Sequence, residues 1–504
     1  MQCFHRSYFA VIQLGNISFR TALDTGSSDA WLISSACTTS ACSVPKYQLA
    51  YKSPSFVTVN NNQTAFNVSF ADGTFANGFV ALETFQVKNL TVPNQGFGVV
   101  SHSNLSFTDD ISGLLGLGFP RLSTIFNSVP SLTPFFATMA QRGQLEYPLF
   151  GLNLGMNTSD TGSLTFGAVD GSVVSNISSI VWNEVMPFAP FGSESNASSY
   201  LQWTIPMGNL TVNGTSLTPI PTYSNISRNS LALFDVGTSG IFGPFQDVSR
   251  IYSAIPGSRL VDEAGQWVVP CDANETISFS FGHKIFLMQP TDYLIGPSES
   301  TPDLCLSWPR ARAPTSDGID WQLGTPFLRT VYSIFSFGID TKEAPMIGLF
   351  PLRNATAPVQ SPDEVASFFS AASATVSTVL PNFLLSTPSP TTPPYAFNTS
   401  VSVSVGEIVS SGLATSTYSP AIGSHHVNAT AIPTLAPSPT LATFILTSDG
   451  QLVTSVSTAA SPSITLGTPP GWSNGSTSHA RVTLGTAVFA AFVPLFLLSA
   501  RLVL

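Results

Sequence analysis

The stretch Phe19-Arg-Thr-Ala-Leu-Asp24-Thr-Gly-Ser-Ser28 recurs about 210 residues later as Ser230-Leu-Ala-Leu-Phe-Asp235-Val-Gly-Thr-Ser239. In each copy an apolar run typical of a buried strand ends in Asp-x-Gly, a tight turn that exposes the carboxylate. A second glycine element follows each copy, at 114–118 in the first half and 322–326 in the second. Two similar halves, each with one Asp-x-Gly loop, predict a pseudo-twofold site that pairs Asp24 with Asp235.

The region around these loops, from about residue 8 to 352, is dense in short β-type runs. Aromatic and β-branched residues alternate with Gly, Asn and Asp breaks, which predicts a mainly β protein. We expect an N-terminal lobe over residues 1–170 and a C-terminal lobe over 171–353. The clearest strands are Tyr8–Leu14, Phe19–Leu23, Phe66–Phe70, Phe79–Val87, Ser163–Phe166 and Ile334–Ile339, and the best helices are Pro134–Arg142 and Phe245–Ala254.

The Asp-Thr-Gly tripeptide alone is weak evidence, because Asp and Gly occupy turns in every kind of fold. The string Asp24-Thr-Gly-Ser-Ser-Asp-Ala-Trp31 is far more specific, since it lies between two apolar runs and has a partner copy. Other sites find no such support. The six histidines are scattered without a His-Glu-x-x-His pattern, and the sequence has neither a Lys-containing phosphate loop nor a Gly-x-Ser-x-Gly elbow.

These motifs resemble those of the pepsin-like aspartic proteases, from about residue 8 to residue 352. The resemblance also covers Phe70-Ala-Asp-Gly-Thr74, Ser112–Pro120, Gly162–Gly167 and Leu323–Phe327. It implies a bilobal fold with a central cleft, polypeptide substrates, and no cofactor or metal. The implied catalytic residues are Asp24 and Asp235, supported by Thr25, Gly26, Ser27, Val236, Gly237 and Thr238. The implied flap and substrate-binding residues are Trp31, Phe70, Asp72, Gly73, Thr74, Ile111, Leu114 and Ser239.

The chemistry implied by this resemblance is a carboxyl pair that shares a proton. Two carboxylates held about 3 Å apart cannot both ionise, so one proton stays between them at acidic pH. The ionised group, as general base, takes a proton from a bound water that attacks the scissile carbonyl, and the protonated group donates to the carbonyl oxygen. Ser27 and Thr238 are expected to hydrogen-bond the outer carboxylate oxygens.

Two positions depart from the family pattern. Val236 stands where a second threonine is expected, so one hydroxyl that would cross to the opposite loop is missing. Phe70 replaces the usual flap tyrosine and cannot hydrogen-bond Trp31. Both carboxylates are present, which favours an active but weakened enzyme. A surface binding protein on a decayed protease scaffold is the main alternative, and a structural cell-wall protein is a third.

The composition indicates the secretory route. Only 9% of residues are charged and the formal net charge is −10, which argues against a nucleic-acid partner and suits an acidic medium. Asn-x-Ser/Thr recurs about sixteen times. Cys37 lies close to Cys42, and Cys271 and Cys305 bracket a second loop; the resemblance places disulfides at both pairs, with Cys3 left over. The N-terminus is no signal peptide, so we expect the sequence to start just before the mature domain, with a cytosolic protein as the competing interpretation.

The C-terminal third has a different composition. Residues 354–475 are dominated by Ser, Thr, Pro, Ala and Val, which predicts a disordered, extended stalk that adds no core. Residues 476–504 end in the apolar run Val482–Leu504, preceded by small residues around Asn474. This order predicts removal of the tail and attachment of a glycosylphosphatidylinositol (GPI) lipid at Asn474. A short transmembrane anchor and simple disorder are the alternatives. The whole chain thus resembles the fungal GPI-anchored, yapsin-type proteases, and we expect a cell-surface monomer.

Overall fold

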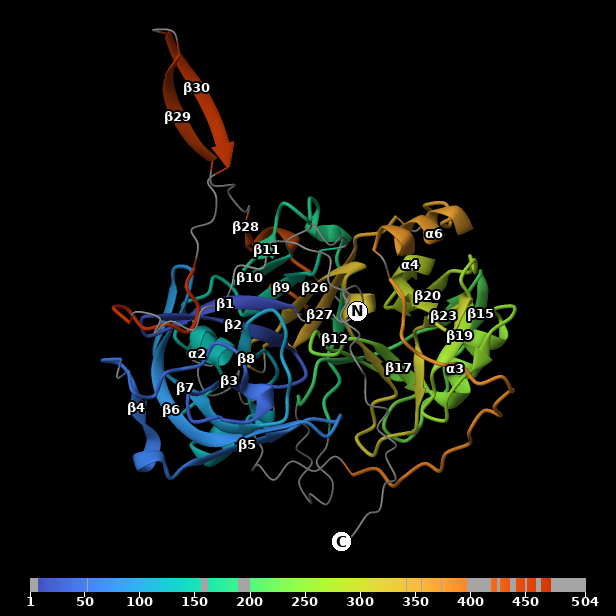
Figure 1. The fold of residues 1–504 in the computed structure, drawn as a ribbon, viewed down its shortest axis with the longest axis horizontal. Coiled ribbons are helices and arrows are strands. Elements are labelled where there is room, and N and C mark those ends of the chain that lie inside the picture. The colour runs from blue at the N-terminus through green and yellow to red at the C-terminus, as the bar shows by residue number, and fades with distance from the viewer. Residues whose placement is uncertain are drawn as a thin grey trace.

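The computed structural model describes residues 8–51, 53–155, 162–188, 200–340, 342–354, 356–372, 374–396, 418–423, 427–435, 441–448, 451–458 and 464–472. Asn474, the apolar C-terminal run, and Cys3 lie outside these residues. Within the described part, strands dominate and helices are short. No helix there is long and apolar enough to cross a membrane. Figure 1 shows two lobes, an N-terminal one drawn mainly in blue to teal and a C-terminal one drawn mainly in green to yellow.

The N-terminal lobe is built on one large mixed sheet with the order β1-β2-β8-β3-β7-β6-β4, and β5 pairs with β6. Its strands are β1 (Phe9–Leu14), β2 (Ile17–Asp24), β3 (Ala30–Ile33), β4 (Val57–Thr58), β5 (Ala65–Ser69), β6 (Phe75–Val87), β7 (Leu90–Ser103) and β8 (Ile111–Gly116). Strand β8 runs parallel to β2 and antiparallel to β3. It therefore lies between them and fixes both ends of the loop that starts at Asp24.

The C-terminal lobe repeats this arrangement in the sheet β13-β16-β25-β17-β24. Strand β25 runs parallel to β16 and antiparallel to β17, and so fixes the loop that starts at Asp235. These strands are β13 (Thr204–Pro206), β16 (Leu231–Phe234), β17 (Ile241–Pro244), β24 (Arg310–Arg312) and β25 (Trp321–Leu323). The three strands β2, β8 and β3 of the N-terminal lobe thus correspond to β16, β25 and β17 of the C-terminal lobe, as the sequence repeat predicts.

Two smaller sheets complete the C-terminal lobe, in the orders β15-β14-β20-β21 and β18-β19-β23-β22. Their strands are β14 (Leu210–Val212), β15 (Thr215–Leu217), β18 (Arg259–Leu260), β19 (Trp267–Pro270), β20 (Ile277–Phe281), β21 (Lys284–Met288), β22 (Leu294–Ser298) and β23 (Thr301–Ser307). Alternate residues of β20, such as Ile277, Phe279 and Phe281, are buried in the main hydrophobic cluster.

A further sheet, β10-β9-β26-β27-β12, takes strands from both halves of the chain. Its strands are β9 (Leu149–Asn153), β10 (Ser163–Phe166), β12 (Val181–Glu184), β26 (Val331–Ser336) and β27 (Met346–Pro351). Strand β9 pairs with β26 between Leu149↔Ser336 and Leu152↔Ser333. Because these are main-chain hydrogen bonds across the two halves, the lobes share one buried sheet and one continuous core that includes Phe150 and Phe335.

The predicted strands and helices are confirmed with small shifts at their ends. The helices are α1 (Thr124–Ser128), α2 (Phe135–Gln141), α3 (Phe245–Ser253), α4 (Pro290–Tyr293), α5 (Thr325–Leu328) and α6 (Pro362–Ala371). Strand β6 starts at Phe75, four residues before the expected Phe79, and the strand expected at Ile334–Ile339 is displaced as a whole to Val331–Ser336. The chain turns at Gly338, whose φ of 74° favours glycine, so the strand stops before it.

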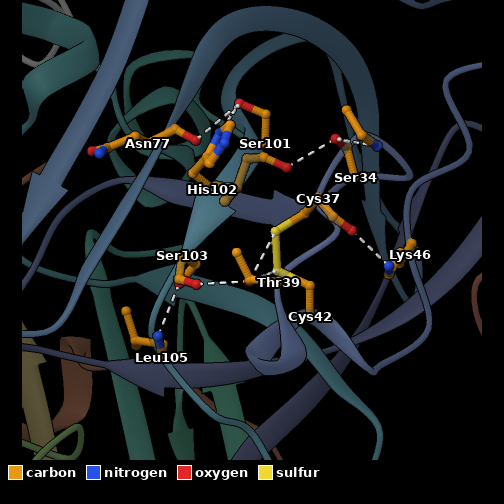
Figure 2. Close-up of a disulfide and its surroundings, with 12 residues drawn as sticks. Ser34, Cys37, Thr39, Cys42, Lys46, Asn77, Ser101, His102, Ser103 and Leu105 are labelled. Carbon is orange, nitrogen blue, oxygen red and sulfur yellow. Dashed lines mark hydrogen bonds between the residues drawn. A yellow bond between two sulfur atoms is a disulfide. The ribbon is translucent and has the colours of Figure 1, made fainter.

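Both expected disulfides are present. Figure 2 shows Cys37–Cys42, where the Thr39 hydroxyl donates to the carbonyl oxygen of Ser103 (2.9 Å) and Lys46 Nζ donates to that of Cys37 (2.7 Å). The bond from Thr39 fixes the disulfide loop against the end of β7, and the bond from Lys46 closes the loop on its other side. The second disulfide, Cys271–Cys305, links the segment after β19 to β23.

Described parts of the Ser/Thr/Pro-rich segment pack against the lobes, which its composition did not lead us to expect. Helix α6 begins with a capping box between Ser361 and Glu364 and buries Val365 and Phe369 in the main core. Further on, Ile422 and Ile432 are buried, and β28 (Thr434–Leu435) pairs with β11 (Val169–Asp170). The hairpin of β29 (Leu441–Ser448) and β30 (Gln451–Thr458) projects away from the lobes in Figure 1. A few apolar residues with local capping thus add to the core.

Candidate active site

The two Asp-x-Gly loops bring their carboxyl groups together between the lobes. Asp24 is the last residue of β2, and Asp235 directly follows β16. Each is only 6% exposed. The Gly26 N–H donates to Oδ1 of Asp24 (2.8 Å) and also to Oδ1 of Asp235 (3.1 Å). One amide therefore joins the inner oxygens of both carboxyl groups.

The glycines of the two loops leave the space that this approach requires. A Cβ atom on Gly26 would lie 3.0 Å from Cγ of Asp235, and one on Gly237 would lie 2.5 Å from Oδ1 of Asp24. A side chain at either position would push the opposite carboxyl group away. The glycine of each Asp-x-Gly motif thus leaves room for the carboxyl group of the other lobe, in addition to its role in the turn.

The outer oxygens are held by hydroxyl groups, as the resemblance implied. The Ser27 hydroxyl donates to Oδ2 of Asp24 and the Thr238 hydroxyl donates to Oδ2 of Asp235, both at 2.5 Å. A third donor was not expected: Gln322 Nε2 lies 3.0 Å from Oδ2 of Asp235. Its only signal in the sequence was its place in the second glycine element, where no role was assigned to it.

Burial and proximity change the protonation of the pair. Loss of hydration and the negative charge of Asp235 raise the pKa of Asp24 from 3.8 to about 7, although hydrogen bonds from Ser27 and Gly26 oppose the shift. A carboxyl group next to a carboxylate retains its proton at acidic pH, because both groups cannot carry charge at this separation. The two carboxyl groups titrate as a pair, and the pair can keep one proton over a wide range of pH below neutrality.

The cross-brace between the loops is one-sided, as Val236 predicts. The Thr25 hydroxyl donates to the carbonyl oxygen of Phe234 (2.9 Å) and accepts from the Val236 N–H (3.0 Å). Val236 is 3% exposed and has no hydroxyl with which to return these bonds. In the described part of the chain, the Thr25 amide has no hydrogen-bond acceptor. Thr25 is therefore the one threonine of the two loops that braces the opposite loop through its hydroxyl, since position 236 has none.

The expected flap is the tip of the β5–β6 hairpin. The Phe70 N–H donates to the carbonyl oxygen of Thr74 (2.8 Å), and Asp72 accepts from the amide (2.9 Å) and the hydroxyl (2.6 Å) of Thr74. Gly73 has a φ of 83°, which the turn requires and glycine permits. Phe70 packs against the cluster that contains Trp31, so the tip is ordered by its own side chains.

The remaining predicted binding residues are placed less closely together. Trp31 and Leu114 are paired neighbours on β3 and β8, and both belong to the cluster beneath Phe70. Ile111 is buried at the start of β8, outside that cluster. Ser239 follows Thr238 in the second loop. Among the described residues, no group of three or more His, Cys, Asp or Glu side chains could hold a metal ion.

Comparison with known proteins agrees with this geometry. The family model of the eukaryotic aspartyl proteases matches residues 7–344. An aspartic protease of Phaffia rhodozyma is 29% identical over 335 residues, which are 65% of this chain and 73% of that protein. Major aspartyl peptidase 1 of Cryptococcus neoformans is 28% identical over 348 residues, 66% of either chain, and cathepsin E of Mus musculus is 28% identical over 341 residues, 66% of this chain and 78% of its own. On its paired loops and on a match over most of its length, the chain belongs to the eukaryotic aspartyl protease family.

Proposed function

We propose that Asp24 and Asp235 are the catalytic pair of an endopeptidase that hydrolyses proteins at acidic pH. The observation that carries this proposal is the shared Gly26 N–H, which lies within 2.8 and 3.1 Å of the two inner carboxylate oxygens. A water held between the two groups would contact a base and a proton donor at once. Because its pKa is raised, Asp24 stays protonated at acidic pH and can act as the proton donor.

The supporting residues are proposed to act by holding the two carboxyl groups in place. Gly26 and Gly237 provide space and amide donors, while Ser27 and Thr238 fix the outer oxygens. Thr25 ties the loops together from one side. The flap residues Phe70 to Thr74, together with Trp31, Ile111, Leu114 and Ser239, are proposed to contact the bound polypeptide.

The test is a digest of a peptide library at several acidic pH values, with and without pepstatin. The natural protein should cleave, and Asp24→Asn and Asp235→Asn should each abolish cleavage, because no other base or donor replaces the lost group. Asp303→Asn is the matched control, since this exposed carboxylate lies on β23. Equal inactivity of the natural protein and Asp235→Asn, with no gain from Val236→Thr, would favour the binding-scaffold alternative.

We also propose that the protein is a secreted monomer anchored at the cell surface by a GPI lipid at Asn474. The sequons and the two disulfides support an oxidising, secretory route. The small residues, polar spacer and apolar end of the sequence support the lipid. A GPI-specific phospholipase should release the protein from intact cells. Retention after this treatment would favour a transmembrane anchor instead.

A further inference from the structure

Gln322 makes the most informative contact in the site that the family motifs do not explain. It lies in β25, opposite Leu233 of the strand that leads to Asp235. Its side-chain nitrogen is 3.0 Å from Oδ2 of Asp235 and 2.5 Å from the hydroxyl oxygen of Thr238. The side chain is therefore directed at the outer face of one carboxyl group of the pair.

The orientation of this amide is determined by Arg312. Nη1 of Arg312 lies 3.0 Å from Oε1 of Gln322. A guanidinium group can only donate hydrogen bonds, so the atom facing it must be the amide oxygen. The NH2 group then faces Asp235, where it can only donate. Arg312, a partly buried residue on β24, thus fixes Gln322 as a donor to the carboxylate.

The other half of the chain contains a natural comparison. In the parallel pair of the first lobe, Leu114 lies opposite Ala22, two residues before Asp24. In the second lobe, Gln322 lies opposite Leu233, two residues before Asp235. Leu114 and Gln322 are therefore equivalent positions of the repeat, and only Gln322 can donate a hydrogen bond. The asymmetry is local to the outer oxygen of one aspartate.

The two carboxyl groups consequently differ in the donors that surround them. Asp24 accepts from the Gly26 N–H and the Ser27 hydroxyl. Asp235 accepts from two amides, one hydroxyl and the glutamine side chain, contributed by Gly26, Gly237, Thr238 and Gln322. Hydrogen bonds donated to a carboxylate stabilise its charged form. The single negative charge of the pair is therefore better stabilised on Asp235.

We propose that Gln322 is a positioning residue that holds the negative charge on Asp235, so that Asp235 is the general base and Asp24 the general acid. This inference rests on the proposed function. As the water oxygen bonds to the scissile carbon, its proton passes to Asp235, and Asp24 gives its proton to the carbonyl oxygen. When the C–N bond breaks, Asp235 passes its proton to the leaving nitrogen, and one hydroxyl of the diol returns a proton to Asp24.

The charged groups around Asp235 enter any test based on pH. Asp24 faces it from β2, and Arg312 lies behind Gln322 on β24. Asp317 and Asp320 lie near Arg312 and favour its charge, although burial lowers its pKa. Arg312 keeps its charge throughout the acidic range, because arginine does not titrate there. A change at Gln322 should therefore act on the titration of the pair alone.

The experiment compares the natural full chain with Gln322→Met, which keeps the length of the side chain and removes the donor. Melting temperatures are measured from about pH 3 to pH 7. The melting temperature of Gln322→Met should lie furthest below that of the natural chain near neutrality. The difference should shrink as pH falls through the lower apparent pKa of the pair, because the lost hydrogen bond stabilises only the carboxylate. Leu114→Met, the equivalent change in the other lobe, should show a deficit that does not vary with pH.

Peptide cleavage gives a second readout. The acid limb of kcat/KM for Gln322→Met should move up by about one pH unit, while KM stays close to its natural value. Arg312→Met should produce part of the same shift, because the amide is then free to turn. A melting deficit that is constant across pH, or an unmoved acid limb, would overturn the inference. If the natural protein cleaves nothing, the proposed function fails, and the melting comparison alone decides the role of Gln322.

Discussion

Replacing Val236 by threonine should strengthen the site, and the structure sets both the sign and the size of the effect. The present brace consists of the Thr25 hydroxyl, bonded to the Phe234 carbonyl oxygen at 2.9 Å and to the Val236 amide at 3.0 Å. Val236 is buried and close in shape to threonine. Its loop lies across from the Thr25 amide, which has no acceptor within the described residues.

A hydroxyl at position 236 that reached this amide would add one buried hydrogen bond. Such a bond contributes about 0.5–1.5 kcal/mol, and removal of an unpaired buried donor recovers about 1–3 kcal/mol. We therefore expect Val236→Thr to raise the free energy of unfolding by about 1–2 kcal/mol. If about 1.4 kcal/mol acted wholly on the transition state, kcat/KM would rise about tenfold, so a several-fold gain is expected.

The assays are urea unfolding and cleavage of a fluorogenic peptide at acidic pH. Thr25→Val serves as the opposite control, because it removes two bonds and leaves a buried carbonyl and a buried amide unpaired, at about 2–4 kcal/mol. The double variant Thr25→Val/Val236→Thr moves the brace to the other loop and should recover most of this loss. A less stable Val236→Thr would refute the reasoning, because it would mean that the new hydroxyl finds no partner.

Three further predictions concern the rest of the molecule. Burial and the neighbouring carboxylate raise the pKa of Asp24 to about 7, so the folded protein should lose stability as pH rises from about 4 to 7. Asp24→Asn should flatten this decline in melting temperature. An unchanged decline in the variant would show that Asp24 does not cause it. Cys271→Ser/Cys305→Ser opens a loop of 34 residues and should lower the free energy of unfolding in urea by about 4 kcal/mol, according to the chain-entropy model. A loss of less than about 1 kcal/mol would contradict this prediction. Phe369→Ala should speed amide hydrogen exchange throughout α6, because Phe369 is 5% exposed, whereas Phe368→Ala, at 38%, should not; equal effects would show that the helix is not docked through Phe369.

Much of the fold could be predicted because local and long-range signals agree in it. The repeat around Asp24 and Asp235 fixed the pairing of the lobes, since each copy combines a strand, a turn and a second glycine element. Alternating apolar residues located strands such as β1 and β10 closely. Strand β26 was displaced, because Phe337 and Ile339 extend the apolar run on either side of Gly338, where the chain turns.

The parts that could not be predicted depend on contacts between distant segments. Gln322 was visible beside Leu323 and Gly324, but its role follows only from the register of β25 and the position of Arg312. Its place in the second glycine element, where Leu114 stands in the first, was the signal that could have singled it out. The docking of α6 likewise depends on a few side chains within a segment whose average composition is that of a stalk. Its capping box was a local signal that a composition argument overlooks.

The sheet shared by the lobes also has a consequence for the order in which the protein can fold during synthesis. Strand β9 leaves the ribosome about 180 residues before β26, its hydrogen-bonded neighbour. At about 5–20 residues per second, that delay lasts about 10–40 s. Through this interval the edge of β9 that pairs with β26 has no partner strand, and the ring of Phe150 packs on Phe136 but lacks its later neighbours Trp203 and Phe335. The nascent first lobe therefore exposes an unpaired strand edge, and its native sheet is completed only when the second lobe has been made.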